Sequence, residues 1–352
     1  MSPNFNEVHE NFKFNGIHYS SFEIKEIAYS LVKEGENYEK KVGRFLLNWS
    51  DSKNFINVKT SGSTCSPKAI QIDKQSMVNS AIATGNYFDL QAGNKALHCL
   101  PTDYIAGKMM LVRAMVLGLE IDLVTPRSSP AFDANLNYDF CAMTPMQLHN
   151  TVNKIANIKC LIVGGAKVSQ TLISSVQQIS TAVYETYGMT ETITHIAVKK
   201  LNHTSTKEYF KVLPNISIDI DERDCLVIQA HHLSRNEIVT NDIVKLIDKN
   251  EFEWLGRYDN VINSGGVKLF PEQIENKLAE FIHTPFFVTS KKDNTLGEKV
   301  VLIVEDEKNT LDPSAFSNLD KYEIPKEVYN VPKFKLTNNG KIKRKATLMT
   351  IE

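Results

Sequence analysis

Short apolar runs alternate with longer amphipathic stretches through the first half of the chain, and this alternation restricts the fold class. Buried strands that alternate with helices are typical of an α/β domain, in which helices cover a sheet. The strand-like runs are Ala96–Leu100, Ile121–Val124, Ile158–Val163 and Ala182–Tyr187, and helical spacing occupies residues 21–33, 36–49, 74–88, 105–117 and 168–179. We therefore predict a large N-terminal α/β domain with layered sheets.

The pattern changes near residue 216, where strand-like runs follow one another closely. Such spacing predicts an antiparallel sheet or a small barrel-like part at the end of the large domain. Beyond Gly256, a polar turn precedes a helix that begins at Pro271, since proline is favoured in a first helical turn. Further strands follow, so we predict a small, mobile α+β domain. The expected domains are residues 1–256 and 257–352.

Charge and composition exclude several functions. The 352 residues carry 40 Lys and Arg against 41 Asp and Glu, a formal net charge of −1, which argues against binding of nucleic acid through bulk charge. The opening residues are polar, and charged residues interrupt the most apolar stretch, Met109–Val124. We expect a cytoplasmic protein without a signal peptide or membrane insertion. The scattered cysteines and histidines predict reduced thiols and no structural zinc.

A run of small hydroxylic residues between two predicted strands could wrap a phosphate. Amides and hydroxyls donate to phosphate oxygens, glycine lets the backbone approach, and lysine adds charge. The spacing is not that of a Walker A loop, and on composition alone a plain polar loop remains the alternative. The run consists of Thr60, Ser61, Gly62, Ser63, Thr64, Cys65, Ser66, Pro67 and Lys68.

Two later segments carry further candidates. In the segment Tyr184–Thr192, Tyr187 offers a flat face for a base, Thr190 a hydroxyl for phosphate, and Glu191 a hard oxygen ligand for magnesium. Further on, the carboxylate of Asp242 and the guanidinium of Arg257 could hold ribose hydroxyls. The alternatives are an ordinary strand-to-turn segment and a surface salt bridge beside a hairpin.

Together with the terminal run Asn339–Arg344, these motifs resemble, in this order, the adenylate-forming superfamily of acyl-CoA synthetases, peptide-synthetase adenylation domains and luciferases. The resemblance extends from Thr60 to Arg344. It implies a ligase that first joins a carboxylate to ATP, giving an acyl-adenylate and pyrophosphate, and then transfers the acyl group to a thiol. It also implies that ATP and CoA are co-substrates, that Mg²⁺ is a cofactor, and that the partner molecule is a small carboxylic acid.

The resemblance also implies a role for individual residues. Thr60–Lys68 is similar to the phosphate loop, and Lys341 to the lysine that the small domain brings to the acyl phosphate. Asp259 falls at the hinge between the domains. The implied catalytic residues are Thr64, Thr190, Glu191 and Lys341, with Glu191 on magnesium. The implied nucleotide site has Gly164, Gly165 and Ala166 along the adenine, Tyr187, Gly188, Met189 and Thr190 as the adenine and phosphate motif, and Asp242 and Arg257 on the ribose. The loop implied for the thioester step contains Gly265 and Gly266.

The chain departs from the superfamily pattern at a few positions. Cys65 stands where a second glycine is usual in the phosphate loop, Glu185 where an amide side chain is more usual, and Tyr104 where histidine is frequent. The loop similar to the phosphate loop also begins at residue 60, so we expect a shortened N-terminal subdomain. That shortness, with the segment Leu100–Met110, resembles the short o-succinylbenzoate–CoA ligases of menaquinone biosynthesis.

An aromatic dicarboxylate needs a cation for the carboxylate that does not react, and we expect it in an acid pocket near Tyr104, at Lys108 or Arg113. Equally, Arg113 could lie on the solvated face of its helix. Other possibilities are a ligase for another aryl or fatty acid, a ligase that loads a carrier protein, and a catalytically silent nucleotide-binding protein. Either a monomer or a homodimer is compatible with the sequence.

Overall fold

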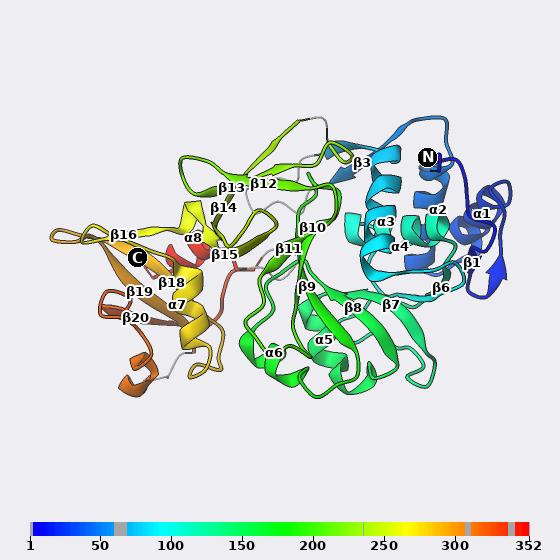
Figure 1. The fold of residues 1–352 in the computed structure, drawn as a ribbon. Helices are drawn as coiled ribbons and strands as arrows, with labels where there is room; N and C mark the ends of the chain where they lie inside the picture. The colour runs from blue at the N-terminus through cyan, green and yellow to red at the C-terminus, as the bar shows by residue number, and fades with distance from the viewer. Residues whose placement is uncertain (1–2, 60–68, 235, 307–310, 337–341, 352) are drawn as a thin grey trace.

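The computed structural model describes residues 3–59, 69–234, 236–306, 311–336 and 342–351. Most of the chain is built on one 13-stranded sheet, in the order β12-β13-β14-β15-β11-β10-β9-β8-β7-β5-β6-β1-β2 (Figure 1). The strands from β1 to β9 along this order pair in parallel. The strands of this half are β1 (Lys13–Phe14), β2 (Ile17–His18), β5 (Lys95–His98), β6 (Glu120–Leu123), β7 (Tyr138–Met143), β8 (Ile158–Val163) and β9 (Ala182–Gly188), and β3 (Phe55–Lys59) and β4 (Ala69–Asp73) form a separate hairpin.

Helices cover both faces of the parallel strands, which makes this region a layered α/β structure. Strand β7 shows the two layers directly, because Phe140 packs into the core beneath α3 and α4 while Cys141 packs into a second core with α5 and α6. The expected α/β fold of this half is confirmed. The helices are α1 (Ile24–Glu34), α2 (Asn37–Trp49), α3 (Lys74–Phe88), α4 (Ile105–Leu117), α5 (Pro145–Thr151) and α6 (Gln170–Ser175), with a 3-10 turn at Val152–Lys154.

The strands after residue 188 extend the same sheet in antiparallel fashion. Each pairs with its neighbour along the order β9, β10, β11, β15, β14, β13 and β12, and the path ends at β12. Of the two expected alternatives, the antiparallel sheet is therefore confirmed and the small barrel is not: within the described residues these strands do not return to close a ring. The strands are β10 (His195–Lys200), β11 (Phe210–Val212), β12 (Ser217–Ile220), β13 (Cys225–Gln229), β14 (Ile238–Leu246) and β15 (Glu251–Arg257).

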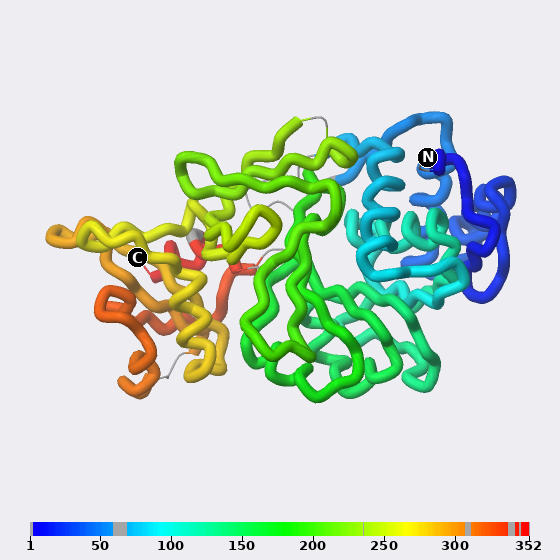
Figure 2. Tube along the Cα trace, in the orientation of Figure 1, coloured from blue at the N-terminus to red at the C-terminus, as the bar shows by residue number. Residues whose placement is uncertain are grey.

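The last part of the chain has its own sheet and its own core, on the left of Figures 1 and 2. Helix α7 packs on β18, and Ile274 and Leu278 from the helix join Val288 and Leu302 in one hydrophobic cluster. This matches the expected α+β character. The elements are a 3-10 turn at Tyr258–Asn260, β16 (Ile262–Ser264), β17 (Val267–Leu269), α7 (Pro271–Leu278), β18 (Phe286–Asp293), β19 (Gly297–Glu305), a 3-10 turn at Pro313–Phe316, β20 (Glu327–Val331) and α8 (Arg344–Leu348).

Among the described residues, no helix is both long and apolar enough to cross a membrane.

Candidate functional site

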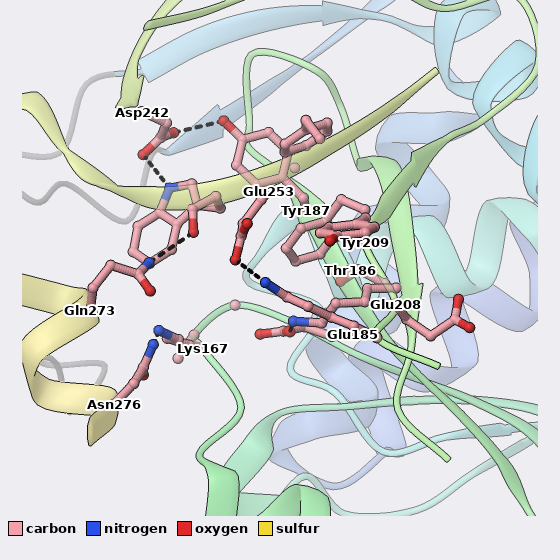
Figure 3. Close-up of a pocket in the computed structure, with 18 residues that line it drawn as sticks. Lys167, Glu185, Thr186, Tyr187, Glu208, Tyr209, Asp242, Glu253, Gln273 and Asn276 are labelled. Carbon is pink, nitrogen blue, oxygen red and sulfur yellow. Dashed lines mark hydrogen bonds and ion pairs between the residues drawn. The ribbon is translucent and has the colours of Figure 1, made fainter. Parts of the chain in front are cut away.

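A pocket of about 310 Å³ lies where β9, β11, β14 and β15 of the large sheet meet helix α7 (Figure 3). It gathers residues that are far apart in the sequence, among them Gly165, Ala166, Tyr187, Gly188 and Asp242. These come from three of the segments singled out above. The structure thus brings the expected adenine segment, the tyrosine motif and the ribose carboxylate to one place.

The segment Gly164–Ala166 follows β8 directly, and its residues Gly165 and Ala166 line one wall of this pocket. Gly164 packs so closely on β9 that a Cβ atom would lie 2.2 Å from Thr186 Oγ1. Gly165 has φ +85°, a conformation that side chains other than glycine rarely adopt. Close packing and positive φ therefore explain both glycines, and they leave the backbone open towards the pocket.

Asp242 is the centre of a hydrogen-bonded group on the opposite wall. Its Oδ2 accepts a 2.8 Å hydrogen bond from Tyr187 Oη, and its Oδ1 accepts one of 3.2 Å from Trp254 Nε1 (Figure 3). Burial, followed by the charge of Asp242, raises the pKa of Tyr187 well above its usual value, so the phenol remains a donor. Two donors thus fix the carboxylate, which retains lone pairs for a ligand.

Arg257 lies beside Asp242 because the two residues are register partners on β15 and β14. Its Nη1 is 3.5 Å from Asp242 Oδ1, and its Nη2 is 3.7 Å from Oδ2 of the exposed Asp259. The expected ribose pair and the expected hinge residue therefore adjoin each other at the point where the chain leaves the large sheet.

The loop between β9 and β10 carries Thr190 and Glu191. Thr192 Oγ1 accepts from Met189 N–H at 3.0 Å and is 2.7 Å from the carbonyl oxygen of Thr194, so it holds the loop closed. The next residue, the buried Ile193, has φ +67°, which is strained for a β-branched side chain. Within this fixed loop, Thr190 is half-buried and Glu191 is exposed.

Arg113 lies in the interior behind this loop. Its side chain is 2% exposed, Nη2 donates to Thr194 Oγ1 at 2.8 Å, and Nε has no hydrogen-bond partner. Burial lowers the pKa of Arg113 to about 9. Among the described residues, no carboxylate forms an ion pair with Arg113. The solvated-face interpretation of Arg113 is therefore wrong, because all of the middle of α4 is buried.

The other two residues expected near the acid lie at the start of α4. Lys108 Nζ donates to the carbonyl oxygens of Thr102 and Asp103 at 2.6 and 2.9 Å, so its ammonium caps the turn before the helix. Burial lowers the pKa of Lys108 to about 8. Tyr104 is exposed and directly precedes the first residue of the helix. Of the three candidates, Arg113 is the one in contact with the loop that carries Glu191.

Some expected site residues lie outside the described residues. They are the whole segment 60–68, with Thr64 and Lys68, and Lys341. Gly265 and Gly266 are described and exposed, at the turn between β16 and β17. This turn lies towards the outer end of the small domain, on the side away from β9 and β10 (Figure 1).

Several residues of the pocket had no role in the sequence-based interpretation. Trp254 lies three residues before Arg257, but nothing in its spacing indicated that its indole would reach Asp242. Lys199 reaches the pocket because β10 pairs with β9 in antiparallel register, which the sequence pattern did not predict. Gln273 and Asn276 come from α7 of the small domain. They were missed because their position depends on how the two parts of the chain pack.

The family model described as "AMP-binding enzyme" matches residues 54–231, just over half of the chain. The chain belongs to this family. An acyl-CoA synthetase (AMP-forming)/AMP-acid ligase II-like protein from Dyadobacter fermentans is 34% identical to this AMP-binding enzyme, with a TM-score of 0.62, and the match covers 93% of this chain and 98% of that one.

Two relatives that share this family carry a more specific name. A 2-succinylbenzoate–CoA ligase from Bacillus cytotoxicus is 23% identical over 94% of this chain and 77% of its own length. One from Staphylococcus aureus is also 23% identical, over 81% of this chain, which spans only 65% of that relative. The structure of o-succinylbenzoate CoA synthetase from Bacillus subtilis in complex with its acyl-adenylate intermediate shares the fold, with a TM-score of 0.71 at 18% identity over 82% of this chain and 68% of that one.

Proposed function

We propose that this chain is an AMP-forming acid–CoA ligase that acts on o-succinylbenzoate in menaquinone biosynthesis. The observation that carries the proposal is the pocket that gathers Gly165, Tyr187 and Asp242, which are the residues expected around an adenosine. The names of the Bacillus and Staphylococcus relatives support the choice of acid. A cytoplasmic location, where ATP and CoA are available, is part of the proposal.

In the first step, a carboxylate oxygen of the acid attacks the α-phosphorus of ATP, and the bond to pyrophosphate breaks. This chain would bind the adenosine between the Gly164–Ala166 segment and Tyr187, with the ribose hydroxyls donating to Asp242. Thr64, Thr190 and Lys341 would stabilise the charge that develops on the phosphate oxygens. Mg²⁺, when bound, would neutralise phosphate charge, and the exposed carboxylate of Glu191 is the hard oxygen donor that suits this ion.

In the second step, the thiol of CoA loses its proton and attacks the acyl carbon, and the bond to AMP breaks. Rotation of the small domain about Asp259 would withdraw Lys341 and bring in Gly265 and Gly266. The outer position of the β16–β17 turn is consistent with a conformation suited to the first step (Figure 1). The two steps would then use two orientations of one domain.

Arg113 supports a substrate with a second carboxylate. A guanidinium that is 2% exposed and forms no ion pair within the described residues is costly, and an incoming carboxylate would offset that cost. The residue contacts Thr194, at the end of the loop that carries Thr190 and Glu191. We therefore propose that the acid lies between α4 and this loop, with its non-reacting carboxylate towards Arg113.

The test is pyrophosphate release by the purified protein with Mg-ATP and a panel of acids: o-succinylbenzoate, benzoate and medium-chain fatty acids, each with and without CoA. We expect selective release with o-succinylbenzoate, and AMP together with an acyl-CoA when CoA is added. Preference for another acid would contradict the substrate but keep the ligase. Adenylation without transfer to free CoA would favour a carrier-protein thiol, and no reaction with any acid would favour a silent nucleotide-binding protein.

A further inference from the structure

Glu185 occupies an unusual position in the wall of the pocket. It lies on β9, two residues before Tyr187, and is 5% exposed. Its Oε1 accepts a 3.0 Å hydrogen bond from the backbone N–H of Val168, and its Oε2 is 2.6 Å from Lys199 Nζ. Both carboxylate oxygens are therefore engaged within the protein, which leaves Glu185 poorly placed to act as a base or a substrate ligand.

The bond to Val168 fastens a functional segment. Val168 follows the stretch from Gly164 to Lys167, whose last three residues line the pocket. Gly164 packs closely on Thr186, but Gly165 has nothing within 4 Å of a Cβ position and no side chain to restrain the stretch beyond it. The hydrogen bond that Val168 N–H donates to Glu185 therefore fixes the far end of the stretch to the strand that carries Tyr187.

Lys199 makes the buried carboxylate tolerable. It is the register partner of Glu185 on the antiparallel strand β10, so the two side chains lie directly opposite each other. Its ammonium also lies 4.8 Å from the centre of the Phe210 ring, a cation–π distance. Loss of either partner would leave an uncompensated charge in a low-dielectric environment.

We propose that Glu185 and Lys199 form a positioning pair, which holds the Gly164–Ala166 segment at the distance from Tyr187 that an adenine ring requires. The inference rests on the proposed function, since it assumes that the pocket binds the adenosine of ATP. Together the two side chains take the place of a neutral amide. Glu185 supplies the acceptor for Val168 N–H, and the positive charge of Lys199 compensates the negative charge of the carboxylate.

The test compares Glu185→Leu, Glu185→Gln and the double variant Glu185→Gln/Lys199→Gln. The readouts are the affinity for AMP by calorimetry and the KM values for ATP and for o-succinylbenzoate in pyrophosphate release. Glu185→Leu removes the acceptor, and we expect about tenfold weaker AMP binding and a similar rise in the KM for ATP, the effect of one hydrogen bond. The KM for the acid should change less than about threefold.

The amide variants separate positioning from charge. Glu185→Gln keeps an acceptor but leaves the Lys199 ammonium without a charged partner. Its affinity for AMP should therefore lie between those of the wild type and Glu185→Leu. The double variant removes the stranded charge and should bind AMP within about threefold of the wild type. Glu34→Gln is the matched control, because Glu34 is an exposed carboxylate at the end of α1 and is not among the residues that line the pocket.

Equal weakening of AMP binding by Glu185→Leu and Glu185→Gln, or no recovery in the double variant, would overturn the inference. So would variants that lower the melting temperature without changing nucleotide affinity. If the wild type binds AMP but does not use o-succinylbenzoate, the proposed substrate fails, and the AMP measurements still decide the role of the pair. If the wild type does not bind AMP, both proposals fail together.

Discussion

Arg113 is the residue whose surroundings say most about the acid, because it is a buried cation without a carboxylate among the described residues. We predict that Arg113→Met raises the KM for o-succinylbenzoate by about thirtyfold or more, equivalent to about 2 kcal/mol for a lost buried charged contact. The melting temperature should stay the same or rise, since an apolar side chain of similar length replaces an uncompensated charge. Steady-state pyrophosphate release and thermal denaturation provide the two measurements.

The opposite combination would contradict this account of Arg113. A variant that melts at a lower temperature but keeps its KM would show that the guanidinium serves the fold through Thr194 and not the substrate. Arg44→Met is the control, because Arg44 is exposed on α2 and the same substitution there should leave both quantities unchanged.

Trp254 gives a second prediction at the level of one residue, because its indole N–H is one of two donors that fix Asp242. Trp254→Phe keeps the ring and removes the donor, so we expect the KM for ATP to rise about five- to tenfold, the effect of one hydrogen bond to a charged group. The discrimination between ATP and its 2′-deoxy analogue should fall as well, since a less well oriented carboxylate binds the ribose less selectively. Unchanged discrimination with a raised KM would mean that Trp254 contributes only surface contact.

At the level of elements, the pairing of α1 and α2 depends on Gly43. A Cβ atom at this position would lie 2.6 Å from the carbonyl oxygen of Ala28 and 2.9 Å from Val32 Cγ2. Backbone cannot move aside cheaply, so Gly43→Ala should lower the free energy of unfolding by about 1–3 kcal/mol despite the better helix propensity of alanine. Urea unfolding measures this loss. Asn48→Ala, on the exposed face of the same helix, should be neutral or stabilising, and equal losses in both variants would contradict the packing argument.

The segment between α2 and β3 is joined to the start of α3 by an ion pair that predicts a pH dependence. Lys74, whose side chain is fully buried, donates to Asp51 Oδ1 at 2.9 Å, and this bond lowers the pKa of Asp51. A carboxyl group whose pKa is lower in the folded state stabilises the fold above its unfolded pKa of about 3.9 and loses that contribution as pH falls through the folded value. Stability at pH 6 should therefore exceed stability below pH 3 partly through Asp51.

Asp51→Asn tests this contribution by denaturant unfolding at several pH values. The variant should be less stable than the wild type at pH 6 by about 1–3 kcal/mol, because the buried ammonium loses its charged partner. The difference should shrink as the pH falls below the usual range of the carboxyl group. A difference that stays constant down to pH 2 would show that the carboxylate charge is not involved. Glu10→Gln, at an exposed position, serves as the control.

The sequence predicted elements better than contacts. Helices α2, α3 and α4 lie within one residue of the expected ranges, because apolar periodicity depends on local burial. The barrel failed for a physical reason: closely spaced strands reveal that they pair as neighbours, but whether the sheet closes depends on β15 pairing with β11 across forty residues. The same holds for Lys199 and Trp254, whose roles depend on strand register and not on spacing along the chain.

At the scale of the whole molecule, polar contacts join the two parts of the chain within the described residues. Lys167 donates to Asn276 at 2.6 Å, Gln273 donates to the carbonyl oxygen of Trp254 at 3.1 Å, and Lys268 pairs with Asp224 at 3.1 Å. Such pairs contribute little stability each, which is compatible with the proposed rotation of the small domain against the large one. The interior of the small domain, by contrast, is held firmly.

Arg344 is part of that firm interior, and it lies three residues after Lys341. Its guanidinium contacts both oxygens of Glu275 on α7, with Nη1 2.8 Å from Oε1 and Nη2 2.9 Å from Oε2, and Nη1 also donates to the carbonyl oxygen of Val288 at 2.8 Å. A two-point pair of this kind fixes direction as well as distance. The start of α8 is therefore anchored to α7.

Arg344→Ala should consequently impair the first step more than the second. We expect pyrophosphate release to fall at least about tenfold, because misplacement of a charge-stabilising lysine by about 1 Å is costly, while thioester formation from supplied acyl-adenylate changes less than about threefold. Arg344→Lys keeps the charge but loses the two-point geometry, so its rate of pyrophosphate release should lie between those of the wild type and Arg344→Ala. Lys341→Ala sets the limit, with adenylation abolished and thioester formation retained. Equal losses of both steps in Arg344→Ala would mean that the anchor maintains the small domain as a whole and does not position Lys341.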